Sequence, residues 1–196
     1  MELSKAEAIA NDISLYMKDY CEDGKIHTAG SIRRRKFDVK DIELVMLPKR
    51  LETKNMFGEV TFVEATALFK KHVENIGKII KGNPNGRMMQ IQLSAGIMLD
   101  LFLPQARDYY RQYAIRTGSR YFSHNVIAMA WLAQGWCGSD MGLRRQDDCE
   151  RHKDKAGKNS WTCINKNGEL PPVWDSEEAF FDWIKVKFVH PVKRDI

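Results

Sequence analysis

Three acidic residues have the types and spacing expected of a site for divalent cations. Asp41 and Glu43 lie two residues apart in a run of alternating character, so on a strand both carboxylates project from one face. Asp100 interrupts an apolar run, where a buried carboxylate is unfavourable without a metal ion or a cationic partner. If the two strands are neighbours, three carboxylates converge. Such a group can bind two Mg²⁺ ions, or Mn²⁺ in their place, for phosphoryl transfer.

A glycine-containing turn upstream of the acidic pair could bind phosphate. Gly30 permits close approach of the backbone, Ser31 adds a hydroxyl, and Arg33 and Arg34 add guanidinium groups that pair with phosphate oxygens. Alone, this segment is more typical of a turn with a helix cap, and an acidic pair alone is typical of an exposed strand face. The combination with a later strand carboxylate favours a nucleotide site.

The elements expected to position these residues form an α+β pattern. Alternation and apolar runs predict strands at 26–29, 41–47, 88–93 and 97–103. Helical spacing of apolar residues predicts helices at 3–20, 62–80, 119–135 and 177–187, and residues 108–114 are expected to be helical or irregular. Residues 138–168 lack periodicity, and we expect loops or a weak hairpin there.

Composition is that of a soluble globular protein of one large or two small domains. The chain has 196 residues, 43% hydrophobic and 29% charged, with a net charge of +5. The basic residues are clustered, for example in Arg33-Arg34-Arg35-Lys36, which is compatible both with a nucleic-acid partner and with a solvated surface. No apolar run is long enough for a membrane span and no signal peptide is evident, so we expect a reducing compartment inside the cell, cytoplasmic or nuclear in type.

The cysteines raise the question of a zinc site. Cys137, Cys149, His152 and Cys163 lie in the polar region, but only Cys149-x-x-His152 has ligand-like spacing. Unligated thiols are therefore the favoured interpretation, with zinc as the alternative.

Longer segments resemble the X family of DNA polymerases, part of the nucleotidyltransferase superfamily that includes polymerase beta. Gly30-Ser31-Ile32-Arg33-Arg34 is similar to the family's Gly-Ser-x-Arg-Arg, and Arg116 to Phe122 is similar to its Tyr-Phe-Thr-Gly-Ser-x-x-Phe segment. Asp175 to Arg194 resembles its C-terminal helix and tail. No counterpart of the lyase domain or the fingers is present, so the chain resembles the reduced palm-plus-thumb members known from viruses, and lyase activity is not expected.

The resemblance implies a catalytic palm at residues 1–106, with a mixed or antiparallel sheet and helices on one face, and a thumb-like nucleotide-binding subdomain at 107–196. Asp41 and Glu43 would bind both metal ions and Asp100 the catalytic one. Gly118-Ser119 would form a turn, often with a cis peptide, that positions the sugar. Candidate nucleotide-binding residues, with Arg120 and Ser123 assigned by position and residue type alone, are Gly30, Ser31, Arg34, Thr117, Gly118, Ser119, Arg120 and Ser123.

Several positions depart from the family pattern. Glu43 replaces an aspartate, and Ile115-Arg116 replaces the Tyr-Phe pair that crowds the ribose 2′ position. Ser123 stands where an asparagine commonly contacts the incoming base, and Ile127 where an arginine commonly contacts the template. These changes leave sugar selectivity open and indicate low fidelity or weak template dependence.

The sequence therefore predicts a monomeric DNA polymerase that fills short gaps in DNA repair or replication. Its expected partners are gapped or primer-template DNA and a deoxynucleoside triphosphate, with Mg²⁺ as cofactor. One alternative is a template-independent transferase acting on DNA or RNA ends, with ribonucleotides as further substrates. Others are an enzyme that nucleotidylates a small molecule or protein, and a nucleic-acid-binding protein with a degenerate site.

Overall fold

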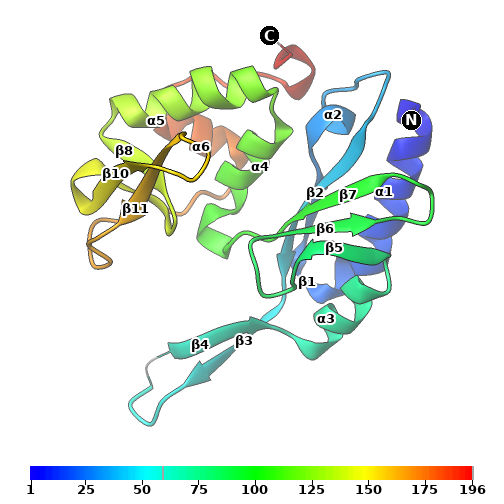
Figure 1. Cartoon of the computed structure of the whole chain (residues 1–196), viewed down its shortest axis with the longest axis horizontal. Coiled ribbons are helices and arrows are strands. Elements are labelled where there is room, and N and C mark those ends of the chain that lie inside the picture. Colours follow the sequence, from blue (N-terminus) through cyan, green and yellow to red (C-terminus); the bar gives the residue numbers. More distant parts are fainter. Residues whose placement is uncertain (59, 196) are drawn as a thin grey trace.

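A five-stranded mixed sheet forms the larger part of the fold (Figure 1). The structure is a computed structural model that describes residues 1–58 and 60–195. The strands are β1 (Cys21–Thr28), β2 (Asp41–Pro48), β5 (Lys78–Gly82), β6 (Met88–Gln92) and β7 (Met98–Phe102). Their order is β1-β2-β7-β6-β5, and only β2 and β7 run parallel. This confirms the expected α+β class.

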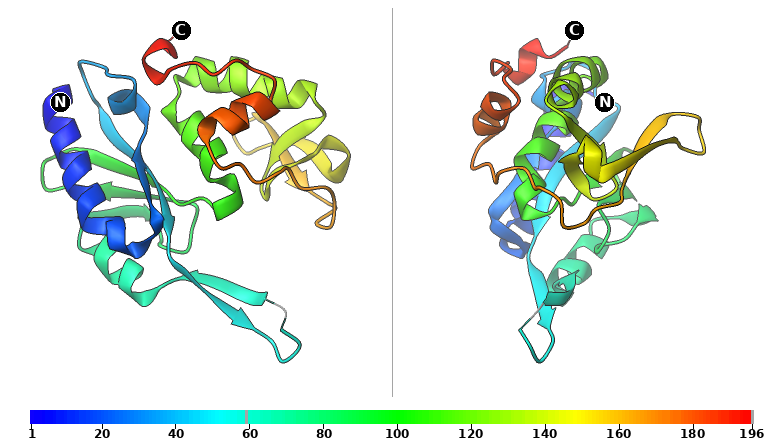
Figure 2. Two further views of the ribbon diagram at one scale, coloured as in Figure 1. Left: turned by 180° about the vertical axis from the view of Figure 1, so that it is seen from behind. Right: turned by 90° about the vertical axis from the view of Figure 1, so that its left-hand side faces the viewer.

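Helices α1 (Leu3–Met17) and α3 (Ala67–Glu74) cover one face of this sheet (Figure 2). The apolar stripe of α1 has helical spacing, and β2 alternates, so both elements direct apolar side chains to the same core. The residues that these two elements bury in this core are Ala6, Ala10, Ile13, Met17, Ile42, Leu44 and Met46.

The opposite face of the sheet is only partly covered. The short helix α2 (Gly30–Arg33) lies at one end of β2, and α4 (Tyr109–Thr117) packs farther along the same face. Tyr109 is fully buried against Val45 and Phe102, and its hydroxyl donates to the Val45 carbonyl at 3.2 Å. The uncovered part of this face begins at the start of β2, where Asp41 lies.

The second half of the chain has its own hydrophobic core. A continuous helix contains the π-helical stretch η3 (Phe122–Ala128) and α5 (Met129–Ala133), and it packs on α6 (Glu177–Trp183). Two hairpins complete this half: β8 (Trp136–Ser139) with β9 (Gly142–Arg145), and β10 (Cys149–Lys153) with β11 (Asn159–Cys163). The described residues contain no helix of the length and apolarity that a membrane span needs.

The largest difference from the sequence prediction concerns the helix expected at 62–80. That segment contains β4 (Val60–Ala65), α3 and β5, and β4 pairs with β3 (Arg50–Lys54) in a projecting hairpin (Figure 1). The hydroxyl of Thr66 accepts a hydrogen bond from the Phe69 amide at 3.2 Å, so the helix begins only after this cap. The apolar residues on either side of the cap happen to continue one helical spacing, which concealed the change of structure.

Smaller differences are found at the other elements. The helix expected at 3–20 ends as α1 at Met17 and continues as a 3₁₀ turn, and the last helix ends at Trp183, just before Lys185 with a positive φ of 59°. Residues 138–168 form two hairpins rather than loops or one weak hairpin. The strands expected at 41–47, 88–93 and 97–103 are confirmed as β2, β6 and β7.

Candidate active site

The three predicted carboxylates lie on one face of two adjacent parallel strands. Glu43 of β2 is the register partner of Asp100 of β7, and Asp41 is paired with Met98, one pleat away. Paired residues on neighbouring strands share a face, and so do residues two apart on one strand. The expectation that the strand of Asp100 lies beside that of Asp41 is therefore confirmed. The two strands are neighbours although β3 to β6 lie between them in the sequence.

Burial and neighbouring negative charge raise the pKa values of Glu43 and Asp41. The pKa of Glu43 is raised from 4.5 to about 7, first by burial and then by the charges of Asp41 and Asp100. The pKa of Asp41 is also raised, by burial first and then by Asp100. Arg34 and Arg116 oppose the shift of Glu43 but do not cancel it. The protein thus concentrates more negative charge here than its own cations neutralise.

The donor atoms suit a hard divalent cation. All three side chains offer carboxylate oxygens, which Mg²⁺ prefers, and their unneutralised charge is what a divalent cation would relieve. Asp100 is held in place by Gln90, whose Nε2 donates to Oδ1 at 2.9 Å. Within residues 1–58 and 60–195, no group of three or more histidine, cysteine, aspartate or glutamate side chains is already arranged to hold a metal ion. The carboxylates are neighbours that would have to close on a cation through side-chain rotation.

Gly30 fits closely against the carboxylate group. Its φ is +58°, and a Cβ at this position would lie 1.7 Å from Oε2 of Glu43. Both the backbone conformation and the contact therefore require glycine. The carboxylate of Glu43 consequently lies directly against the turn that carries Ser31 and Arg34.

A groove of about 280 Å³ joins this turn to the carboxylates. Its lining residues are Ser31, Arg34, Lys36, Asp38, Lys40, Asp41 and Glu43. The hydroxyl of Ser31 is buried and has no hydrogen-bond partner among the residues that the structure describes. The groove therefore has a cationic side, formed by Arg34, Lys36 and Lys40, and an anionic side at the carboxylates. Sequence analysis missed Lys36 and Lys40, although the basic run 33–36 pointed to the first of them.

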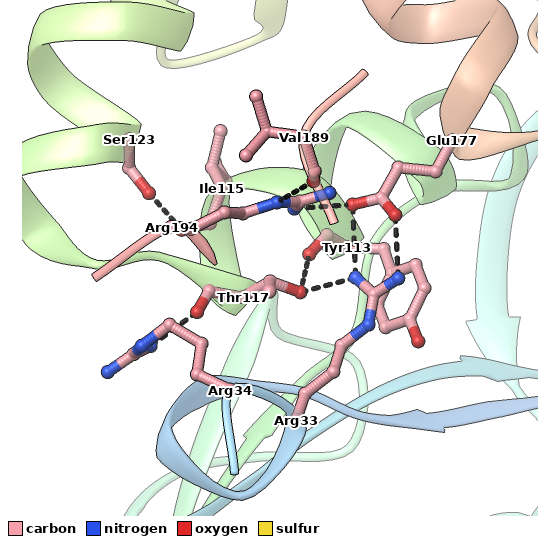
Figure 3. Close-up of polar contacts among 9 residues, drawn as sticks. All are labelled: Arg33, Arg34, Tyr113, Ile115, Thr117, Ser123, Glu177, Val189 and Arg194. Carbon is pink, nitrogen blue, oxygen red and sulfur yellow. Dashed lines mark hydrogen bonds and ion pairs between the residues drawn. The ribbon is translucent and has the colours of Figure 1, made fainter. Parts of the chain in front are cut away.

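A buried ion-pair network joins α2 to the second half of the chain (Figure 3). Arg33 donates two hydrogen bonds to Glu177, at 3.0 Å and 2.6 Å, and Arg194 donates a third at 2.8 Å. The Arg33 guanidinium also donates to Thr117 Oγ1 at 2.5 Å and lies 3.6 Å from the centroid of the Tyr113 ring. Arg194 is fully buried and Glu177 is 4% exposed. Sequence analysis missed these roles, since nothing in a single sequence pairs residues 144 positions apart.

The Thr117-Gly118-Ser119 segment contacts Arg34, one of the residues that line the groove. The Gly118–Ser119 peptide is cis, and Arg34 Nη1 donates to the Thr117 carbonyl. Ser119 is held by the protein itself, because its amide donates to the Arg194 carbonyl at 3.1 Å and its hydroxyl accepts from the Phe122 amide at 3.2 Å. The predicted nucleotide-binding residues Gly30, Ser31, Arg34, Thr117, Gly118 and Ser119 are thus brought together.

The other two predicted nucleotide-binding residues do not line the groove. Arg120 is exposed, and the hydroxyl of Ser123 donates to the Ile115 carbonyl at 2.7 Å, within the helical region itself (Figure 3). Ile127 is fully buried in the second core. Arg116, by contrast, approaches the carboxylates: its guanidinium lies 4.1 Å from the centroid of the Phe102 ring, on the strand face that also carries Asp100.

The four residues considered for zinc do not converge. Cys137, Cys149 and Cys163 are buried together, whereas His152 is exposed and lies an odd number of residues from Cys149 on β10. Residues so spaced on a strand point to opposite faces. Burial, followed by a hydrogen bond with Cys149, raises the pKa of Cys137 to about 12. Burial also raises the pKa of Cys149, so burial disfavours the thiolate form of both residues.

Comparisons with known proteins show similarity in fold alone. No protein-family model and no curated protein sequence matches this chain. Among solved structures, the ternary gap complex of Leishmania infantum polymerase beta matches with a TM-score of 0.67 and 16% identity, over 100% of this chain and 71% of that one. The ternary P/T complex of the same polymerase matches with a TM-score of 0.64 and 15% identity, over 100% and 77%. The fold of this chain is therefore similar to that of polymerase beta.

Proposed function

We propose that this protein is a metal-dependent nucleotidyltransferase that adds nucleotides to the 3′ end of a nucleic acid, as a DNA polymerase of the X-family type. The observation that carries the proposal is the pairing of Glu43 with Asp100 across parallel strands, with Asp41 on the same face beside a cationic groove. The similarity of fold to polymerase beta in complexes with gapped and P/T substrates supports it.

In this proposal residues 1–106 are the palm and residues 107–196 the nucleotide-binding subdomain. Asp41 and Glu43 would hold two Mg²⁺ ions and Asp100 the one beside the primer 3′-hydroxyl. Bound there, the ions would neutralise the charge that develops on the attacking and leaving oxygens. Gln90 orients Asp100 through its hydrogen bond at 2.9 Å. Gly30 keeps the phosphate-binding turn in contact with Glu43.

The groove residues supply the contacts to the triphosphate. Ser31 and Arg34 offer a hydroxyl and a guanidinium to phosphate oxygens, and Thr117, Gly118 and Ser119 form the floor against which the sugar would lie. Arg34 already bonds to the Thr117 carbonyl, so phosphate binding and the shape of the sugar site are linked through one side chain. DNA and a deoxynucleoside triphosphate are the proposed substrates.

One observation favours template-independent addition as a second candidate function. The hydroxyl of Ser123 donates to the Ile115 carbonyl, and Ile127 is fully buried, so neither side chain is positioned to contact a base pair. Few contacts would then check pairing between the template and the incoming nucleotide. The same site would extend a DNA or RNA end without copying.

Single-nucleotide extension tests both functions. Each dNTP and rNTP is offered with Mg²⁺ on a one-nucleotide gapped duplex and on a bare single strand. Template-directed addition to the duplex would support the gap-filling polymerase, and addition to the bare strand irrespective of sequence would support the transferase. No addition to either substrate by folded protein would overturn both.

The control variants separate loss of the site from loss of the fold. Asp100→Asn should reduce addition on the order of 10³-fold or more, because one oxygen ligand becomes an amide. Asp182→Asn removes an exposed acid of α6, far from β7 in sequence, and should leave the rate unchanged. Equal activity of wild type and Asp100→Asn would show that the carboxylate group is not the catalytic centre.

A further inference from the structure

A carboxylate from the last described residue reaches the cationic side of the groove. Asp195 Oδ1 lies 3.3 Å from Nε of Arg34, and its Oδ2 pairs with Nζ of Lys36. The Arg34 and Asp195 side chains are 14% and 24% exposed, so the contact is largely shielded from solvent. Both cations line the same groove as Ser31 and Glu43.

The cationic side of the groove offers more hydrogen-bond donors than Asp195 uses. Among residues 1–58 and 60–195, Nε of Arg34 has no hydrogen-bond partner even though Asp195 is 3.3 Å away, so that contact is one of charge without a directed hydrogen bond. Within the same described part of the chain, the buried hydroxyl of Ser31 also lacks a hydrogen-bond partner. A group with several acceptor oxygens, such as a phosphate, would satisfy both donors, whereas the two oxygens of one carboxylate do not.

The position of Asp195 is fixed by the residue before it. Arg194 is fully buried, its Nε donates to the Val189 carbonyl at 2.7 Å, and its carbonyl accepts from the Ser119 amide at 3.1 Å. The Asp195 side chain forms ion pairs with Arg34 and Lys36. Rotation of the Asp195 side chain would break these two ion pairs, whereas the hydrogen bonds of Arg194 do not involve Asp195.

We propose that Asp195 occupies a phosphate subsite formed by Arg34 and Lys36, and that a nucleoside triphosphate binds by displacing it. This inference rests on the proposed function, since it assigns an internal competitor to the same nucleotide site. The carboxylate supplies one negative charge and two acceptor oxygens, and a phosphate supplies more of both. The tail thereby lowers the affinity of the groove for phosphate and keeps its cations paired when no nucleotide is present.

A positioning role for Asp195 predicts the opposite change in phosphate affinity. If Asp195 served to orient Arg34 toward phosphate, removal of its charge would weaken phosphate binding. If it competes, removal of its charge strengthens binding. The sign of the change in affinity therefore decides between a competitor and a positioning residue.

Binding of inorganic tripolyphosphate, measured by calorimetry in EDTA, tests the sign without metal ions or catalysis. Asp195→Asn should bind about three- to tenfold more tightly than wild type, as expected for loss of one partly screened ion pair. Asp38→Asn is the matched control, because Asp38 lines the same groove but pairs with the amino group of Met1. It should strengthen binding less than twofold. Weaker or unchanged binding by Asp195→Asn, or equal strengthening in both variants, would overturn the inference.

A second readout follows the tail directly. In ¹⁵N-labelled wild-type protein, saturation with tripolyphosphate should move the Asp195 amide resonance toward its position in an unstructured peptide, while that of Arg194 stays in place. An unmoved Asp195 resonance at saturation would also overturn the displacement. Because neither measurement involves nucleotide addition, failure here would leave the proposed enzymatic function standing, and failure of the extension assay would leave this competition measurable.

Discussion

The half-buried Glu43 and the buried Glu177 lie in opposite electrostatic environments. Glu43 faces the acids Asp41 and Asp100, and its pKa is raised to about 7 by burial and by those charges. For Glu177, burial again favours the protonated form, but hydrogen bonds and charges from Arg33 and Arg194 outweigh it, so its pKa falls below 4.5. One glutamate is destabilised as an anion and the other is stabilised.

The contrast separates the carboxylate group, whose charges are not balanced within the protein, from the Glu177 network, which we call the holding contact. The Glu177 network satisfies its charges within the protein and ties α2 to α6, which joins the two hydrophobic cores. The carboxylate group is left with surplus charge, a state that costs stability until a cation relieves it. Arg33, the last residue of α2, belongs to the holding contact, and Arg34, its C-cap, lines the groove. The two regions are therefore connected through adjacent residues.

Replacement of Glu177 should change the free energy of unfolding more than replacement of Glu43. Glu177→Gln leaves Arg194, which is fully buried, and Arg33 without their anion, and the free energy of unfolding should fall by about 3–5 kcal/mol. The folded-state pKa of Glu177 lies below its unfolded value, so its contribution is present above about pH 4.5 and is lost as pH falls through the folded pKa. Urea unfolding at pH 7 and at pH 3.5 measures both effects, and the difference between variant and wild type should shrink at the lower pH.

The neighbouring residue provides the control for this change. Glu178→Gln alters the same turn of α6, but Glu178 is exposed, so a change within about 0.5 kcal/mol is expected. If both substitutions cost the same, the effect belongs to the helix end rather than to the buried network.

Removal of the destabilised glutamate should have a smaller effect of opposite sign. In EDTA at pH 8, Glu43→Gln should increase the free energy of unfolding by up to about 3 kcal/mol, since a pKa raised from 4.5 to about 7 penalises the ionised folded state. A raised pKa stabilises the fold at low pH, and this contribution disappears as pH rises through about 7. The gain should therefore be much smaller at pH 5, close to the unfolded pKa of 4.5, than at pH 8. Thermal unfolding at both pH values measures it, with the exposed Glu52→Gln as control.

The same comparison explains how far the sequence could be interpreted. The carboxylate group was predictable because strand alternation places Asp41 and Glu43 on one face and because Asp100 stands out in an apolar run. The Glu177 network was not, because its members are ordinary charged residues whose pairing depends on the packing of two cores. Even the approach of Arg116 to the carboxylates depends on where α4 crosses the sheet, which no local pattern specifies. The helix expected at 62–80 failed for a local reason, the cap at Thr66.

Thr117 contacts both the Glu177 network and the groove. We expect its side chain to contribute to the holding contact and not to nucleotide binding. Its hydroxyl accepts from Arg33 and donates to the Tyr113 carbonyl at 2.7 Å, whereas its backbone carbonyl serves Arg34 in the groove. Thr117→Val removes the hydroxyl at nearly constant volume, so stability should fall by about 1–2 kcal/mol, less than either glutamate change. The nucleotide KM should stay within about twofold of wild type, because the carbonyl and its bond to Arg34 remain. Thr117→Ser, which keeps the hydroxyl, should recover most of the stability. The opposite result would be a nucleotide KM raised tenfold or more in Thr117→Val and unchanged in Thr117→Ser. It would show that the hydroxyl is part of the nucleotide site and that the two regions are not functionally separate.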